Sequence, residues 1–345
     1  MDTIDNLISS SIDVIRRCSL KNGAILASYS KDRDTNNYRF VWPRDASYTL
    51  IAANILGIDI HENFFDWCQK AEGWEKTGLF YEKYHPSGKK ARFNFQPDQT
   101  GTLLVALWDY YRDKKKINHE KLITKSAQAI CRVWDKDHFW LVTEDLWEER
   151  KCFPDYRENF TYSLAACVKG LKCAYELINN NRWKETAEEM EKLIAGNRHF
   201  YRSFGGVEDR RIDASLLGLV WPFRIVDADD RRMVNAVELM ESKIVKDHRV
   251  YRYEHDEYDG WMYKGRLQRN RGAGYWPLLN FWMAMYYAER GDKNKALKYY
   301  NKVIEDVKNH IPEQVFENKI QKSVTPLCWS HAMFLIASNK LGYIK

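Results

Sequence analysis

Residues 275–309 read YWPLLNFWMAMYYAERGDKNKALKYYNKVIEDVKN, two helical segments separated by a Gly–Asp pair at 291–292. Apolar side chains of the second segment recur with a helical period, at Ala296, Tyr300, Val303 and Val307. They lie on one face of an α-helix, with charged residues on another. Because so short a link joins only neighbouring antiparallel helices, this stretch predicts a helical hairpin.

The same helical period recurs along the chain. It predicts twelve helical segments, at 4–20, 46–57, 61–73, 100–113, 119–134, 159–178, 182–197, 212–220, 231–242, 275–290, 293–309 and 326–341. Strand-like alternation is scarce, with short candidates only at 247–253 and 138–143. We therefore expect an all-α fold.

The links between these segments alternate in length. Those after the odd-numbered helices are long, at 21–45, 74–99, 135–158, 198–211, 243–274 and 310–325, whereas those after the even-numbered helices are mostly short. Alternating links place every long link at the same end of an antiparallel assembly. We expect six hairpins closed into a double-layered ring, an inner barrel within an outer one. A helical solenoid is the alternative, but no fixed sequence period recurs.

Composition and charge limit the function classes. With 45% hydrophobic and 14% aromatic residues, the 345-residue chain can bury a sizeable core. Its 54 basic and 48 acidic residues are interleaved, so no basic face for nucleic acid is expected. Asp2 and Asp5 stand where a signal peptide is basic, and no apolar run is long enough to span a membrane. We expect a cytoplasmic protein that binds neither nucleic acid nor membranes.

The seven cysteines lack a CxxC pair, and several sit among apolar residues. This is typical of buried free thiols rather than of disulfides or a zinc site. His138 and His255 each stand beside an aspartate, but without metal-ligand spacing. We expect no metal and no cofactor.

Aromatic and charged residues concentrate in five of the six long links. Examples are YRFVWPRD at 38–45, EDLWEER at 144–150, RVYRYEHDEYDGWMYKG at 249–265 and IPEQVF at 311–316, and the link at 74–99 is rich in aromatic residues. Aromatic rings stack on the CH faces of sugars, and Arg and Asp bind sugar hydroxyls. One aromatic in a loop is usually a packing anchor. Five such links at one end of the molecule predict a carbohydrate pocket.

Glycoside hydrolysis needs two carboxyl groups, one to protonate the leaving oxygen and one to attack or to activate water. Glu148 follows Trp147, whose indole would provide an apolar wall that raises the carboxyl pKa. Glu313 stands in IPEQ before the last helix. Taken alone, each segment favours a structural interpretation: a charged helix start or a solvated turn for EDLWEER, and a helix opening at Pro312 for IPEQVF.

Four segments, in order, resemble glycoside hydrolase family fifteen, the glucoamylases with their glucodextranase and microbial trehalase relatives. They are YRFVWPRDASYTL, DLWEER followed by FTYSLAACVKGL, RYEHDEY, and IPEQ followed by PLCWSHAMF, and they span residues 38–332. The resemblance implies a six-over-six (α/α) helical barrel of twelve helices, which agrees with the helix count above.

By this resemblance Glu148 is the general acid, and Glu313 is the general base that deprotonates the attacking water. Tyr38 helps to hold that water. Arg44 and Asp45 bind the hydroxyls of the terminal glucose. The motif YRFVWPRD would then form the floor of a pocket for one sugar ring.

The other matches would surround the same sugar. Trp42 forms a wall of the subsite, Trp147 and Glu149 flank the acid and reach the glucose units, and Arg252 binds substrate. Further candidates are Asp256, Trp221 and Arg224. The last two lie in a link after an even-numbered helix, where a structural role is the alternative.

The resemblance implies an inverting, exo-acting glycoside hydrolase that releases β-glucose from the non-reducing ends of α-linked gluco-oligosaccharides. Inversion requires carboxyls roughly 6.5–9.5 Å apart, so that water fits between the base and the sugar. A trehalase or an α-1,6-glucosidase on the same scaffold is the alternative. A non-catalytic helical sugar-binding or interaction protein would be expected to have disrupted carboxylates, whereas both glutamates are present. The oligomeric state stays open.

Prokaryotic members of the family usually carry an amino-terminal β-sandwich domain before the barrel, whereas the first pocket motif here begins at Tyr38. We therefore expect residues 1–345 to form a single catalytic barrel domain without that sandwich. No starch-binding module or Ser/Thr-rich linker is visible in the sequence, so short soluble glucans or disaccharides are the expected substrates.

Overall fold

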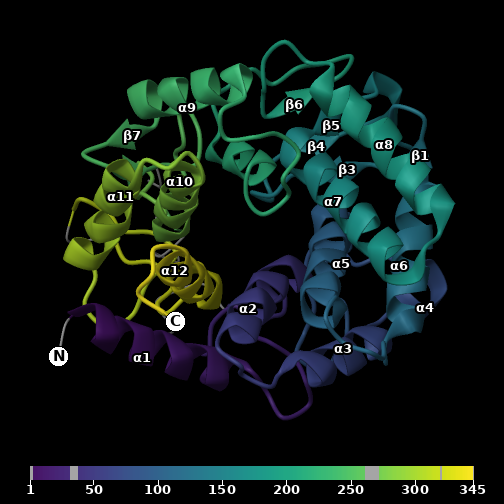
Figure 1. Ribbon diagram of the computed structural model, residues 1–345, viewed down its shortest axis with the longest axis horizontal. Coiled ribbons are helices and arrows are strands. Elements are labelled where there is room, and N and C mark those ends of the chain that lie inside the picture. Colours follow the sequence, from purple (N-terminus) through teal and green to yellow (C-terminus); the bar gives the residue numbers. More distant parts are fainter. Residues whose placement is uncertain (1–2, 32–37, 261–271, 319–320, 345) are drawn as a thin grey trace, which may run out of the picture.

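Helices in two concentric rings dominate the computed structural model, which describes residues 3–31, 38–260, 272–318 and 321–344 (Figure 1). The chain enters an outer helix, then an inner one, and repeats this alternation around the ring. The ring closes where the first helix, at the amino end, packs on the last. The fold is therefore the all-α, double-layered helical barrel that the link lengths predict.

Among the described residues, six helices form the inner ring: α2 (Pro43–Ile55), α5 (Pro97–Tyr111), α7 (Thr161–Ile178), the 3-10 helix η2 (Ala214–Leu219), α10 (Pro277–Glu289) and α12 (Cys328–Lys340). Each contacts the next, and α12 contacts α2. Every residue of 43–53, 97–107, 277–287 and 328–338 is buried. Helices buried on all sides require a second layer of protein around them.

The outer ring consists of α1 (Thr3–Cys18), α3 (His61–Lys70), α6 (Glu120–Val133), α8 (Asn181–Ala195), α9 (Arg231–Lys243) and α11 (Lys293–Asp306). These helices bury one face only. In α11 the buried residues are Ala296, Tyr299, Tyr300 and Val303, and α11 packs on α10. The predicted hairpin is confirmed, because its apolar stripe covers the inner ring while its charged face meets solvent.

Two inner helices, α2 and α5, begin three residues earlier than the hydrophobic period indicates, whereas α10 begins two residues later. Pro43, Pro97 and Pro277 occupy the first turns of α2, α5 and α10. Proline is favoured there because its fixed φ suits the helix and its missing N–H would be unpaired anyway. Consequently Arg44 and Asp45 lie in the first turn of α2 rather than in the preceding link.

The eighth expected helix, 212–220, is the short 3-10 helix η2. The Asp213 side chain accepts a hydrogen bond from the backbone N–H of Ser215 at its start. Pro222 follows closely after its end. Proline has no N–H and disfavours helical backbone in the residue before it, which keeps this inner element short.

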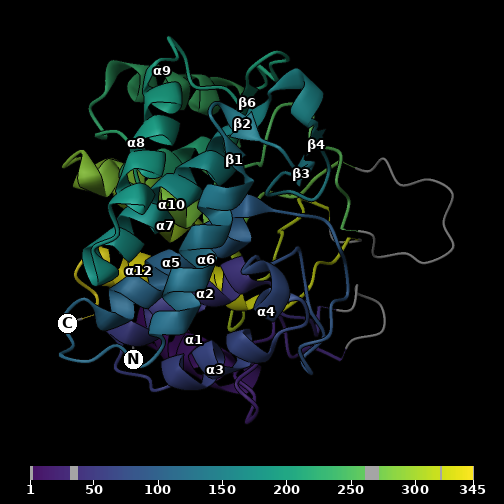
Figure 2. The same ribbon diagram turned by 90° about the vertical axis from the view of Figure 1, so that its right-hand side faces the viewer.

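The long links contain the remaining regular structure: α4 (Trp74–Thr77), the 3-10 turn η1 (Pro154–Tyr156), and the antiparallel pairs β1 (Trp134–Asp135) with β2 (His138–Phe139), β3 (Thr143–Glu144) with β4 (Lys151–Cys152), β5 (Asn159–Phe160) with β6 (Ser203–Phe204), and β7 (Val245–Lys246) with β8 (Arg249–Val250). Figure 2 shows β3 and β4 at one end of the barrel. This is the end at which the chain enters the inner helices.

All seven cysteines are buried free thiols, as the sequence predicts. Within the described ranges, no helix combines the length and the apolar character needed to cross a membrane.

Helices α5 and α7 approach each other closely through two glycines. A Cβ added at Gly101 would lie 2.6 Å from the backbone of Ala166, and one at Gly170 would lie 2.5 Å from the Gly101 carbonyl oxygen. No side chain can move aside here, because the obstacle in each case is backbone. The two glycines therefore set the spacing of these inner helices.

Gly101→Ala is expected to lower the free energy of unfolding by about 1–3 kcal/mol through overpacking, despite the better helix propensity of alanine. Thermal and denaturant unfolding measure the change. Gly196→Ala is the control, because the nearest atom to its added Cβ is 3.2 Å away, on the α8 backbone. Equal losses of stability in the two variants would contradict this account of the α5–α7 contact.

Candidate active site

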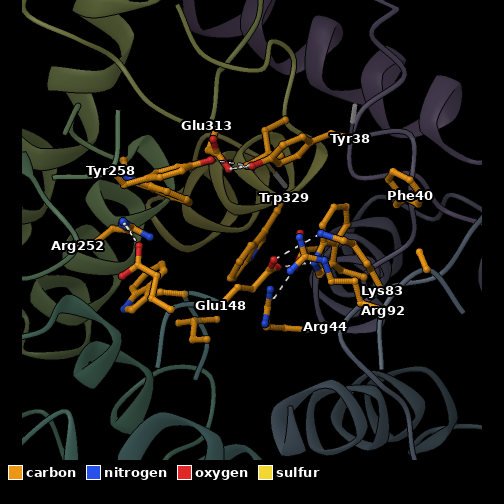
Figure 3. Close-up of a pocket in the computed structure, with 18 of the residues that line it drawn as sticks. Tyr38, Phe40, Arg44, Lys83, Arg92, Glu148, Arg252, Tyr258, Glu313 and Trp329 are labelled. Atoms are coloured by element: carbon orange, nitrogen blue, oxygen red, sulfur yellow. Dashed lines mark hydrogen bonds and ion pairs between the residues drawn. The ribbon is translucent and has the colours of Figure 1, made fainter. Parts of the chain in front are cut away.

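A cavity of about 700 Å³ lies at the end of the barrel where the long links enter the inner helices. Five links contribute side chains to it, and these are the five that the sequence singled out. The lining includes all the residues to which the family resemblance assigns a catalytic or main substrate-binding role: Tyr38, Trp42, Arg44, Asp45, Trp147, Glu148, Glu149, Arg252 and Glu313. Figure 3 shows Glu313 beside Tyr38 on one side and Glu148 near Arg44 and Lys83 on the other.

Arg44 is buried, and three side chains accept hydrogen bonds from it. Its guanidinium donates hydrogen bonds to Asp45 Oδ1 at 3.1 Å, and to Gln96 Oε1 and Asp98 Oδ2 at 3.0 Å each. The same group lies over the Trp329 ring, 5.2 Å from its centroid. Burial raises the pKa of the Asp45 carboxyl to about 6, although Arg44 opposes the shift. These contacts fix the position of the polar atoms at the base of the pocket.

Glu313 is buried in the link before α12. The Tyr38 hydroxyl donates to Glu313 Oε1 at 2.8 Å, and the Ser323 hydroxyl lies 3.5 Å from Oε2. Burial raises the pKa of Glu313 to about 7, while the Tyr38 hydrogen bond and the Arg252 charge oppose the rise and Asp45 adds to it. The carboxyl therefore changes charge near neutral pH.

The segment IPEQVF does not open a helix, so that interpretation is wrong. Val315 exchanges backbone hydrogen bonds with Tyr275 at 2.9 and 3.1 Å, and the Glu313 N–H donates to the Val324 carbonyl at 3.0 Å. The tertiary pairing of these links provides the backbone partners that a helix would otherwise supply. It also fixes the Glu313 backbone from two directions.

Glu148 lies in a tight turn with a left-handed backbone conformation, φ +62°. Asp145 closes this turn: its carbonyl accepts from the Glu148 N–H at 3.1 Å, and its Oδ1 accepts from the N–H groups of Glu149 and Arg150 at 2.9 and 3.0 Å. The buried Arg202 pairs with the other carboxylate oxygen of Asp145. Of the two structural interpretations of EDLWEER, the turn is correct and the helix start is wrong. The turn is not solvated, however, because residues 143–147 are buried. A non-glycine residue with positive φ is uncommon and requires such support.

The Glu148 side chain is 26% exposed and faces the cavity. Trp42 Nε1 donates to its Oε1 at 2.6 Å, and Lys83 Nζ lies 3.5 Å from its Oε2. Burial raises the pKa of Glu148 to about 8, opposed by Lys83 and reinforced by Glu82. The indole bonded to this carboxyl is that of Trp42, whereas the Trp147 N–H donates to Asp213 instead.

Arg252 organises a second group of side chains. It donates to Glu149 Oε1 at 2.7 Å and to both oxygens of Asp256 at 2.8 Å. The Tyr253 hydroxyl donates to the other oxygen of Glu149. Asp256 is not part of the cavity lining, so its place in the site is behind Arg252, which it orients.

Trp221 and Arg224 lie away from the cavity. Trp221 packs on Tyr48, with ring centroids 6.0 Å apart. Arg224 reaches to 4.0 Å from Glu289, at the C-terminal end of α10. The cavity is at the N-terminal end of that helix. Both residues lie in a link after an even-numbered helix, and such links lie at the end of the barrel opposite the cavity. Trp221 and Arg224 therefore have a structural role rather than a place in the pocket.

Sequence reasoning missed several lining residues: Lys83, His85, Arg92, Tyr258, Trp276 and Trp329. Trp276 carries a detectable signal, because it precedes the first-turn proline of an inner helix, as Trp42 does. Trp329 lies in the quoted segment PLCWSHAMF. Lys83 has no comparable signal, since a single lysine in a long link is ordinary. Within the part of the chain that the structure describes, no group of three or more His, Cys, Asp or Glu side chains is arranged to hold a metal ion.

Residues 68–339 match the model of the glycosyl hydrolases family 15. The chain belongs to this family. An uncharacterized glycosyl hydrolase of Methanocaldococcus jannaschii, MJ1610, is 30% identical over 349 residues, covering 92% of this chain and 52% of the relative. Trehalase 2 of Sulfolobus acidocaldarius is 27% identical over 335 residues, covering 85% of this chain and 55% of the relative. The chain thus spans about half the length of these two relatives.

Solved structures agree with the family 15 assignment at the level of the fold. A glycosidase variant in complex with glucose superposes with a TM-score of 0.82 at 20% identity, covering 99% of this chain and 98% of the other. A bacterial glucoamylase complexed with acarbose superposes with a TM-score of 0.75 at 23% identity, covering 97% of this chain and 55% of the other.

Proposed function

We propose that this family 15 protein is an inverting, exo-acting hydrolase that releases β-glucose from the non-reducing ends of α-linked gluco-oligosaccharides. The observation that supports this most is a pair of carboxyls, Glu148 and Glu313, on opposite sides of one pocket. Burial raises the pKa values of both toward neutrality. Two carboxyls on separate sides of a sugar site suit inversion, in which acid and base act on opposite faces of the ring.

In this mechanism Glu148 carries a proton and Glu313 is ionised. Glu148 gives its proton to the glycosidic oxygen as the bond from that oxygen to C1 breaks. Glu313 removes a proton from water as the water oxygen forms its bond to C1 from the opposite face, which gives β-glucose. The Tyr38 hydroxyl, which donates to Glu313, would hold the water in line.

The remaining side chains would bind the terminal glucose. Arg44 and Asp45 present fixed charged atoms for its hydroxyls, and Trp42 forms a wall beside the acid. Arg252 and Glu149 form a second polar pair at the cavity surface. Charged groups with fixed geometry bind hydroxyls at low entropic cost.

Trehalose is the second candidate substrate. The similarity to Trehalase 2 of Sulfolobus acidocaldarius extends over 85% of this chain, whereas the likeness to the acarbose-bound glucoamylase is one of fold. Because both reactions need an acid, a base and one glucose site, the choice between them depends on the groups around the leaving sugar.

The test is glucose release from maltose, maltotriose, isomaltose and trehalose, with the product anomer followed by proton NMR. We expect β-glucose from one of the α-linked oligosaccharides; from trehalose, inversion gives one glucose of each anomer, since the leaving sugar keeps its α configuration. Initial release of only α-glucose would overturn the inverting mechanism. No release from any of them would favour a non-catalytic sugar-binding protein.

Glu148→Gln and Glu313→Gln are each expected to reduce kcat by roughly 10²–10⁴-fold, the usual contribution of a positioned acid or base. The folds should persist, because the changes are nearly isosteric. Circular dichroism and steady-state kinetics measure the two effects. Glu317→Gln is the control: this glutamate is half exposed and pairs with Lys246, away from the cavity. If kcat fell less than ten-fold in Glu148→Gln or in Glu313→Gln, the role assigned to that glutamate would be contradicted.

The pH dependence of kcat/KM should be bell-shaped. Glu313 must be ionised, so activity falls as the pH drops through its pKa of about 7; Glu148 must be protonated, so activity falls as the pH rises through about 8. The optimum is therefore expected between these values. A profile that is flat from pH 6 to pH 9 would contradict the assignment.

A further inference from the structure

Glu148 has a carboxylate neighbour, Glu82, that lies outside the cavity lining. Lys83 Nζ stands between the two carboxyls, 2.9 Å from Glu82 Oε1 and 3.5 Å from Glu148 Oε2. The side chain of Glu82 is fully buried, at 0% exposure. The two carboxyls are also close enough that each shifts the pKa of the other. Two acids and one ammonium thus form a compact group at the edge of the pocket.

The surroundings decide which acid of the pair holds a proton. Glu82 has the closer contact to Lys83, accepts from Asn94 Nδ2 at 3.1 Å, and has Arg92 Nε at 3.7 Å. Glu148 has the more distant contact to Lys83 and accepts from the neutral Trp42 indole, with Arg44 acting on it from further away. Charge is therefore better compensated on Glu82.

The pKa values of the two groups separate accordingly. Burial works to raise the pKa of Glu82, but the interaction with Glu148 and the charges of Lys83 and Arg92 outweigh it, so the pKa is lowered. For Glu148, burial and Glu82 both raise the pKa. A buried carboxylate next to a second carboxyl makes the ionisation of the second unfavourable.

We propose that Glu82 is a positioning residue of the hydrolytic reaction: ionised and buried, it accepts a hydrogen bond from the Glu148 carboxyl and keeps that carboxyl protonated, while Lys83 limits the effect. This role rests on the proposed function of Glu148 as general acid. After Glu148 gives its proton to the leaving oxygen, two carboxylates face each other across one ammonium. Their repulsion favours uptake of a proton from water by Glu148, which restores the acid for the next turnover.

The two neighbours should shift Glu148 in opposite directions. Glu82→Gln removes a negative charge and offers an amide donor, so it should lower the pKa of Glu148 by at least about one unit. Lys83→Met removes the cation and should raise it. The matched control is Glu158→Gln, because Glu158 is also a buried carboxyl, bonded to Ser203, and no contact joins it to Glu82 or Glu148 among the residues that the structure describes.

The measurement is a pH titration of ¹³C-labelled glutamate carboxyls by NMR in the full chain. The Glu148 signal is assigned by its loss in Glu148→Gln. Opposite shifts in Glu82→Gln and Lys83→Met, with no shift in Glu158→Gln, would support the proposal. An unchanged Glu148 pKa in Glu82→Gln would overturn it. Should Glu82→Gln fail to fold, Lys83→Met alone decides: a Glu148 pKa that does not rise overturns the proposal.

Kinetics separate this inference from the proposed function. In Glu82→Gln the basic limb of kcat/KM should move to lower pH, with about a five-fold loss at pH 8 for a one-unit shift from about 8. KM should stay within two-fold at low pH, because Glu82 does not line the cavity. A protein that shows the carboxyl shifts but hydrolyses none of the four sugars would retain the Glu82–Glu148 coupling and lose the proposed hydrolase function.

Discussion

The ion pairs of Arg44 connect the pocket floor to the inner ring. This buried guanidinium, in the first turn of α2, binds Asp98 in the first turn of α5, and Asp98 in turn accepts from Ser163 of α7 at 2.6 Å. Three consecutive inner helices are thereby joined at the end where the cavity opens. Removing one partner would leave an uncompensated buried charge, a loss of about 3–5 kcal/mol. The site and the barrel therefore share the same interactions, and neither can change independently of the other.

The neighbouring side chains favour the ionised form of one glutamate at this end of the barrel and the protonated form of the other. Glu313 has a tyrosine donor and the Arg252 charge, both of which favour its ionised form. Glu148 has a buried carboxylate behind it, which favours its protonated form. A difference of this kind divides the work of one acid and one base between chemically identical side chains. In the proposed reaction both proton transfers take place near neutral pH without any change in residue type.

Buried hydrogen bonds fix the backbone around both glutamates. Asp145 closes the turn that holds Glu148 in a left-handed conformation, and backbone pairing with the α10 link holds the Glu313 segment. Neither glutamate lies in a helix, where neighbouring side chains would be fixed by the helical period. Each lies in a link whose conformation depends on buried hydrogen bonds to other links, which is how precise geometry arises in irregular backbone.

The helical period and the alternation of long and short links determined the two-layered barrel. The period shows which face of each helix must be buried, and the link lengths show which helices are neighbours. The same links, read for aromatic and charged residues, indicated which ends of the helices form the site and which residues line it. Helix starts at Pro43, Pro97 and Pro277, and the short η2, differ from the sequence prediction because first turns and 3-10 helices carry little periodic signal. Only the tertiary structure decided two pairings between links: Lys83 meets Glu148, and Val315 pairs with Tyr275, across long stretches of chain. Such contacts depend on how the ring closes, and no local pattern encodes them.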